Sequence, residues 1–150
     1  MGKRFSGTKT WVMLLALILF SASARPDIVV IVNAASNVEQ LSRDDVVNIF
    51  MGRYRKLPDG TSVMPLDIKG DAPEKKDFYK ALLDKNLPEV NAYWARLVFS
   101  GRTSPPLILE DADQVLKKVT LDPTVIGYTT DSGTREGVKI VYRLPVTSTP

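Results

Sequence analysis

Apolar residues recur along the chain with two different periods, which predict strands that alternate with helices. The continuous β-branched run over 27–33 is typical of a strand buried on both faces of a sheet. Shorter apolar segments predict further strands over 63–68, 124–128 and 138–144. Pro65 lacks a backbone N–H, so the strand that contains it is expected at an edge or at an irregular position.

Helical spacing of apolar residues predicts four helices between these strands. The first is expected to begin at Ser42, which can form a capping box with Asp45, and to end at Gly52. The others are expected after residue 73, from 88 to 100, and from 111. Their apolar faces are Val46, Ile49 and Phe50 in the first; Phe78, Ala81 and Leu82 in the second; Val90, Tyr93, Trp94, Leu97 and Val98 in the third; and Ala112, Val115, Leu116 and Val119 in the fourth.

Length and element order together predict one α/β domain. The chain has 150 residues, the size of a single ordinary domain. Strands that alternate with helices pack as layers around one core, so we expect about four helices around a small mixed sheet. This domain is expected to span residues 25–144, and residues 145–150 are expected to form a flexible tail.

The first 24 residues carry the pattern of an export signal. Basic residues precede an unbroken apolar stretch over 11–20, and an Ala-Ser-Ala sequence ends at Ala24. A stretch of ten apolar residues is shorter than the roughly 20 that a membrane-spanning helix needs. We therefore expect cleavage after Ala24 and a secreted, periplasmic domain without a membrane span; the alternative is an uncleaved N-terminal anchor.

Charge changes the picture once this segment is set aside. The full chain has 20 basic and 17 acidic residues, a net charge of +3. Lys3, Arg4 and Lys9 lie in the first 24 residues, which hold no acidic residue, so 17 basic residues face 17 acidic ones in the remainder. Because phosphate contacts dominate nucleic-acid affinity, a neutral domain argues against a nucleic-acid partner.

Composition also argues against catalysis. The sequence has no histidine and no cysteine. These absences exclude nucleophile pairs that use either residue, the usual zinc sites and disulfides. The acid pairs at 44–45 and 111/113 lie at expected helix starts, where carboxylates are stabilising in any case. We therefore expect a non-enzymatic domain without a metal or cofactor.

A series of short sequences resembles the small, exported members of the phosphate-binding-protein-like superfamily, the type 2 periplasmic solute-binding proteins of phosphate ABC transporters. The resemblance implies a single lobe of that fold, because full-length members have two lobes that close on the anion. It covers about 28–144 and matches mainly the second lobe. The sequences that carry it are 49–53 (IFMGR), 58–60 (PDG), Phe78, 92–94 (AYW), 99–102 (FSGR), 105–106 (PP) and 126–128 (IGY).

The resemblance also implies where an anion would bind. Relatives present an Arg-x-x-Gly-Ser-Gly-Thr-like segment at the start of the helix that carries the Phe78-like residue, and a helix N-terminus offers unpaired N–H donors. The corresponding segment here is 67–73 (DIKGDAP), which lacks the hydroxyls and places a carboxylate where the phosphate would lie. It is therefore either an altered anion site or a plain helix cap formed by Asp71. The candidate ligand-binding residues are Asn33, Arg53, Lys69, Gly70, Asp71 and Ala72.

Three other features have competing interpretations. The sequence Asp-Ser-Gly-Thr at 131–134 copies the anion segment in letters, but no helix is expected after it, so we expect a turn. The basic cluster of Arg53, Arg55 and Lys56 is either a solvated helix end or part of an anion site. Tyr93 and Trp94 lie on an apolar helix face, which favours core packing over ligand stacking.

Two functions are consistent with these observations. The first is an exported solute-binding domain that captures phosphate or another small oxyanion for an ABC-type uptake system, with the transporter or a periplasmic protein as partner. The alternative is a protein-interaction module that keeps the lobe but has lost its ligand. The exported-enzyme class is the weakest, because the residue types provide no nucleophile–base pair.

Overall fold

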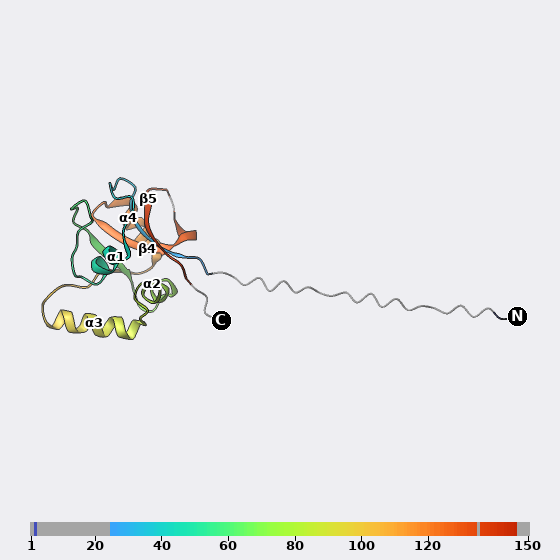
Figure 1. Ribbon diagram of the computed structural model, residues 1–150, viewed down its shortest axis with the longest axis horizontal. Helices are drawn as coiled ribbons and strands as arrows, with labels where there is room; N and C mark the ends of the chain where they lie inside the picture. The colour runs from blue at the N-terminus through green and yellow to red at the C-terminus, as the bar shows by residue number, and fades with distance from the viewer. Residues whose placement is uncertain (1, 3–24, 135, 147–150) are drawn as a thin grey trace.

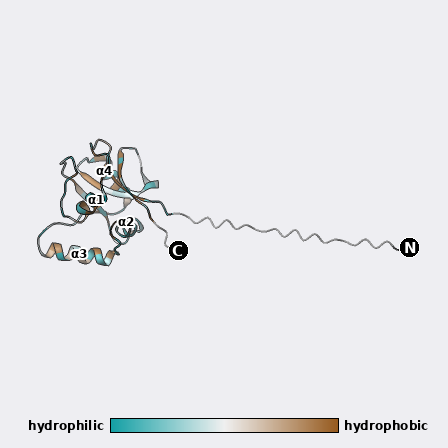
Figure 2. Cartoon of the chain, in the orientation of Figure 1, coloured by the Kyte–Doolittle hydropathy of each residue, from teal (hydrophilic) through white to brown (hydrophobic). Residues whose placement is uncertain are grey.

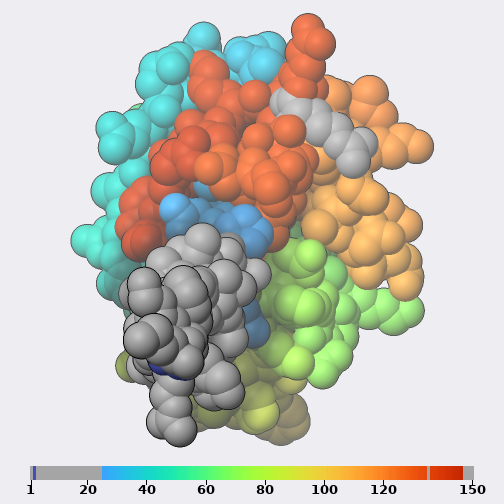
Figure 3. All heavy atoms as spheres, turned by 90° about the vertical axis from the view of Figure 1, so that its right-hand side faces the viewer, coloured from blue at the N-terminus to red at the C-terminus, as the bar shows by residue number. Residues whose placement is uncertain are grey.

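The computed structural model describes residue 2, residues 25–134 and residues 136–146. The export signal expected at 1–24 lies outside the described residues apart from Gly2, and so do residues 147–150 of the expected tail. Within the rest of that tail, the amide of Val146 donates to the Asp27 carboxylate over 3.2 Å. The described end of the chain therefore lies against the start of the first strand, and Figure 3 shows these blue and red segments side by side.

The described residues form a five-stranded mixed sheet with four α-helices, which confirms the α/β expectation (Figure 1). The strand order is β3-β2-β4-β1-β5. None of the helices in this part of the chain is both long and apolar enough to cross a membrane. The elements are β1 (Ile28–Asn33), α1 (Arg43–Phe50), β2 (Met64–Ile68), α2 (Pro73–Leu83), α3 (Leu87–Phe99), β3 (Leu107–Leu109), α4 (Ala112–Leu121), β4 (Val125–Thr130), a short 3-10 helix (Asp131–Gly133) and β5 (Val138–Leu144).

Strand β1 lies inside the sheet, as its β-branched sequence predicts. It runs antiparallel to β4 on one side and to β5 on the other, whereas β2 runs parallel to both β4 and β3. Residues 28–32 are at most 1 % exposed. Such complete burial requires that helices cover both faces of the sheet.

Neighbouring residues of β4 show which helices cover which face. Gly127 faces α4 so closely that an added Cβ would lie 2.5 Å from Cγ1 of Val115. The next residue, Tyr128, points to the opposite face, where its ring stacks on Phe78 of α2 with a 4.0 Å centroid distance. Phe50 of α1 packs edge-on against Phe78 at 4.8 Å. The sheet therefore lies between α4 on one face and α1 with α2 on the other.

The local signals of the first helix are confirmed. The Ser42 hydroxyl accepts the Asp45 amide over 3.1 Å, and the Asp45 carboxylate accepts the Ser42 amide over 3.0 Å. These two bonds form the expected capping box, and the hydrogen bonds from Ser42 lower the pKa of Asp45. Gly52 follows the helix with φ +72°, in the left-handed region that glycine adopts without strain.

Of the two positions expected for the strand that contains Pro65, edge or irregular, the edge is wrong for the strand as a whole. β2 lies between β3 and β4, but its ladder with β3 begins only at Leu66. Pro65 pairs on the β4 side and precedes that ladder, so its missing N–H does not interrupt the β2–β3 hydrogen bonds. The sequence pattern also missed β3, which is only three residues long.

Helix α3 has the expected amphipathic pattern, but its last turn is not covered. Val90 and Trp94 are buried, which confirms core packing for the Trp94 ring, and the Tyr93 hydroxyl donates to the Met51 carbonyl over 2.7 Å. Val98 is 52 % exposed and Phe99 is 96 % exposed. Figure 2 shows hydrophobic and hydrophilic residues side by side along this helix, which lies at the margin of the molecule.

Candidate functional site

The expected anion segment forms the link between β2 and α2. The Lys69 ammonium lies 3.0 Å from the Glu110 carboxylate. Ala72 is the N-cap of α2 and has no side-chain capping bond, and Pro73 provides no N–H. The carboxylate of Asp71 instead pairs with Lys76 over 3.0 Å, and that hydrogen bond lowers the pKa of Asp71. Asp71 is therefore not the helix cap that the sequence suggested as an alternative.

Gly70 and Asp71 line a cleft between the starts of α2 and α3, which we call the lysine cleft. Its volume is about 770 Å³. Each of its three lysines has a carboxylate partner: Lys76 has Asp71, Lys80 has Asp84, and Lys85 has Glu89. The residues that line it are Gly70, Asp71, Lys76, Asp77, Lys80, Lys85, Asn86, Leu87, Pro88 and Asn91.

Asn33 does not join this cleft. Its amide donates to the carbonyls of Val119 and Thr120 over 3.1 and 2.9 Å, which ties the end of β1 to the end of α4. β1 is antiparallel to β4, and β2 is parallel to β4. The last residue of β1 therefore lies at the same end of the sheet as the first residue of β2. The anion segment follows the other end of β2. Asn33 and Gly70 therefore lie at opposite ends of the sheet.

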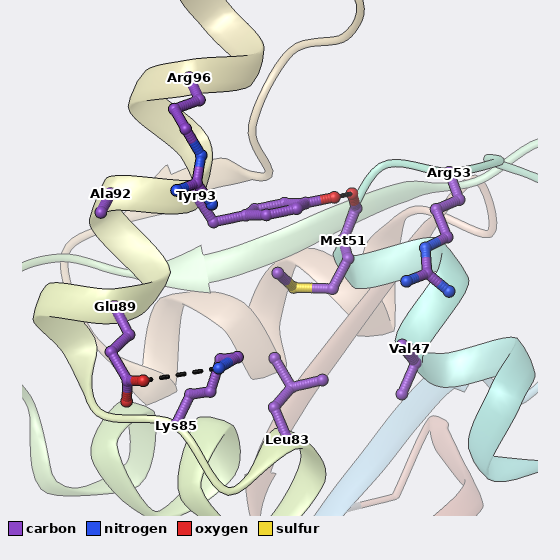
Figure 4. Close-up of a pocket in the computed structure, with 9 residues that line it drawn as sticks. All are labelled: Val47, Met51, Arg53, Leu83, Lys85, Glu89, Ala92, Tyr93 and Arg96. Carbon is purple, nitrogen blue, oxygen red and sulfur yellow. Dashed lines mark hydrogen bonds and ion pairs between the residues drawn. The ribbon is translucent and has the colours of Figure 1, made fainter.

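Arg53 lies at the rim of another pocket, which we call the arginine pocket (Figure 4). Its guanidinium donates to the Asn48 side chain over 3.0 Å. Arg55 points elsewhere, with hydrogen bonds to the Ser104 carbonyl and to Met64, and burial lowers its pKa. Arg53 and Arg55, which form one basic cluster in the sequence, therefore have different surroundings in the structure.

The arginine pocket combines an apolar floor with a cationic rim. It encloses about 380 Å³ between α1, α2 and α3. Val47, Met51, Leu83, Ala92 and the Tyr93 ring provide most of its apolar surface. The charged residues around it are Arg53, Lys85, Glu89 and Arg96.

A buried polar cluster beneath α2 was missed by the sequence analysis. The carboxylate of Asp67 accepts the Tyr128 hydroxyl over 2.6 Å and the Tyr79 hydroxyl over 2.9 Å. The Lys75 ammonium lies 3.3 Å from the same carboxylate and donates to the Ile68 carbonyl over 2.9 Å. Burial, followed by the Asp67 charge, raises the pKa of both tyrosines well above its ordinary value. The one available signal was a carboxylate inside an apolar strand.

Asp67 and Lys75 also line a third pocket, of about 350 Å³, beneath α3. Trp94 contributes to its wall, and the indole Nε1 is buried without a hydrogen-bond partner among the described residues. Most of the other lining residues are apolar, including Val98 and Ile108. Because Asp67 and Lys75 pair with each other, this pocket has no excess of positive charge.

The remaining candidate segments form a turn and a helix cap. The segment 131–134 forms one 3-10 turn between β4 and β5, with no α-helix after it, as expected. Asp111 caps α4 by accepting the Gln114 amide over 2.8 Å. In the described parts of the chain, no three acidic residues gather in a way that would hold a metal ion.

Comparison with known proteins finds solved structures with a similar fold. No family model and no curated protein matches the sequence. The solved structures that match over 79 % of this chain include an ABC-type phosphate transport receptor from Vibrio cholerae (TM-score 0.62, 13 % identity, 46 % of that chain), a protein from Clostridium perfringens assigned as a phosphate ABC transporter substrate-binding protein and holding phosphate (0.62, 15 %, 45 %), and PstS from Borrelia burgdorferi (0.59, 13 %, 47 %). The chain thus has the fold of phosphate ABC transporter substrate-binding proteins over slightly less than half of their length.

Proposed function

We propose that this chain is an exported, non-enzymatic solute-binding domain that captures phosphate or another small oxyanion for an ABC-type uptake system. The observation that supports this most is the lysine cleft. Gly70 and Asp71, which the resemblance places at the anion site, share this cleft with three ammonium groups. Proteins of the same fold are phosphate receptors of ABC transporters.

An anion can enter the lysine cleft by replacing carboxylates that already lie there. The side chains of Lys76 and Asp71 are 54 % and 85 % exposed. Exposed ion pairs of this kind contribute only about 0–1 kcal/mol, so their exchange for a bound oxyanion costs little. Asp71 opposes binding, because its charge repels the anion and occupies Lys76.

The test is a phosphate titration of the purified protein, followed by thermal shift and calorimetry. Because a ligand that binds only the folded state raises its stability, phosphate should raise the Tm in a saturable way. Asp71→Asn should bind phosphate about tenfold more tightly, since it removes a competing charge, and Lys76→Gln about tenfold more weakly. Lys117→Gln, which removes an exposed cation of α4 outside the cleft, should bind as the wild type does. No binding at millimolar phosphate or sulfate would refute the proposal.

A second function, protein interaction, is favoured by an exposed apolar patch at the end of α3 and on β3. Phe99 is 96 % exposed, and Val98, Leu107 and Ile108 are about half exposed. Val98 and Ile108 line the same pocket, so the two segments are neighbours, and β3 lies at the edge of the sheet. Clustered exposed apolar residues often mark protein interfaces.

This alternative is tested by sedimentation over a wide range of protein concentration. Self-association that Phe99→Ser abolishes would support it. A protein that stays monomeric at all concentrations and has no partner in pull-downs would count against it.

A further inference from the structure

The arginine pocket would contact a ligand through different chemical groups from those of the lysine cleft. Its floor and walls are aliphatic or aromatic, from Val47, Met51, Leu83, Ala92 and Tyr93. The one hydroxyl among them, on Tyr93, already donates to the Met51 carbonyl over 2.7 Å. This bond joins α3 to the end of α1 and holds two sides of the pocket together (Figure 4). A ligand inside the pocket thus meets apolar surface.

Positive charge gathers at the opening. Arg96 approaches from α3 and Arg53 from the segment after α1, on opposite sides of the pocket (Figure 4). Arg53 donates to the neutral Asn48 side chain, and no carboxylate of the described residues pairs with either guanidinium. Lys85 adds a third cation.

The single carboxylate of the rim does not neutralise the two arginines. Glu89 accepts the Asn86 amide over 2.9 Å as part of the capping box of α3, and that hydrogen bond lowers the pKa of Glu89. Its other oxygen lies 3.5 Å from Lys85. Three cations therefore face one carboxylate that is already engaged, although the chain from residue 25 onward is neutral.

We propose that the arginine pocket binds a small organic monocarboxylate with an apolar body. The body occupies the apolar floor, and the carboxylate stays at the rim, where guanidinium groups form charge-assisted hydrogen bonds. A pocket of about 380 Å³ is in the range that accommodates small organic ligands. Inorganic phosphate is a poor occupant, because it would leave the apolar surface exposed to water. This ligand class differs from the oxyanion proposed for the lysine cleft, although Lys85 lines both sites.

The experiment compares three probes by calorimetry with the purified protein. 4-Phenylbutyrate should bind in a saturable way, and acetate, which lacks the apolar body, should bind at least about tenfold more weakly. The uncharged amide of 4-phenylbutyrate should also bind about tenfold more weakly, because it loses the charge-assisted bonds. Inorganic phosphate at about 1 mM should not displace 4-phenylbutyrate, because the floor of the pocket is apolar.

Variants locate the site. Arg96→Gln and Arg53→Gln should each weaken 4-phenylbutyrate binding about tenfold. Both side chains lie on the surface, so folding should be retained, and circular dichroism checks it. Arg102→Gln is the matched control, because it removes an exposed guanidinium that does not line the pocket.

Four outcomes would overturn the proposal. Equal affinity for the carboxylate and its amide would make the pocket merely apolar, and displacement by phosphate would make it a general oxyanion site. Unchanged binding in both Arg53→Gln and Arg96→Gln would place the ligand elsewhere. A dimer that Arg96→Gln dissociates would mean that a second copy of the chain occupies this surface.

Discussion

At the scale of single residues, the buried Asp67–Lys75 pair is the most constrained feature. Both side chains are less than 10 % exposed, so each charge depends on the other for compensation. The two tyrosine hydroxyls and the Ile68 carbonyl satisfy further hydrogen-bonding groups of the pair. Removing one member should leave an uncompensated charge in the interior, which costs much more than the intact pair contributes.

Lys75→Met should lower the free energy of unfolding by about 3–5 kcal/mol, because it leaves the Asp67 charge buried without its ammonium. The double variant with Asp67→Asn should lose less than the sum of the two single variants, since each removes the penalty of the other. Urea unfolding measures all four proteins.

Lys76→Met is the control for this cycle. The Lys76 side chain is 54 % exposed, and exposed ion pairs contribute about 0–1 kcal/mol, so its loss should be small. Strictly additive effects of Lys75→Met and Asp67→Asn would contradict the coupling.

At the scale of elements, local signals predicted the helices well and the strands unevenly. Ser42 and Asp45 cap α1 through neighbours three residues apart, so the sequence contains the whole capping box. β3 has three residues and Leu107 is exposed, so it offers no periodic pattern. Its strand conformation depends on pairing with β2, about 40 residues earlier.

The stability that Asp122 contributes at the end of α4 is expected to depend on pH. The Asp122 carboxylate accepts the hydroxyl and the amide of Thr124 over 2.6 and 2.9 Å and pairs with Lys118 over 3.0 Å. The Thr124 hydrogen bonds, with a smaller contribution from Lys118, lower the pKa of Asp122 from 3.8 to about 2. A depressed folded-state pKa adds stability that is complete above the unfolded value and is lost as pH falls toward the folded one.

The wild type should therefore have a Tm a few degrees higher than Asp122→Asn at pH 6. This difference should decrease between pH 3.8 and about 2, the interval between the two pKa values. Calorimetric melting of both proteins from pH 2 to pH 6 measures it. A difference that does not change with pH would show that the charge of Asp122 is unimportant.

At the scale of the whole molecule, stability should be distributed unevenly. β1 is paired on both sides and buried on both faces, whereas the last turn of α3 lies at the margin with Val98 and Phe99 exposed. Segments with little buried apolar contact open first. The arginine pocket uses residues 89–96 of α3 as one wall, so its shape depends on how firmly this helix packs on the rest of the fold.

Hydrogen exchange followed by mass spectrometry should detect this difference. Amides of 28–32 should exchange last, through global unfolding, and amides of 97–101 at least about a hundredfold faster, through local opening. Equal protection of both segments would mean that α3 opens only together with the sheet. 4-Phenylbutyrate should slow exchange in α3 if it binds as proposed.

The sequence by itself determined the α/β class, the starts of the helices and the burial of β1, because capping and periodicity depend on residues a few positions apart. Only the tertiary structure decided which polar groups meet. It placed Asn33 and Gly70 at opposite ends of the sheet, joined Asp67 to Tyr128 across 61 positions, and formed the arginine pocket from three helices. These arrangements follow from strand order and helix packing, which bring together residues that no local pattern connects.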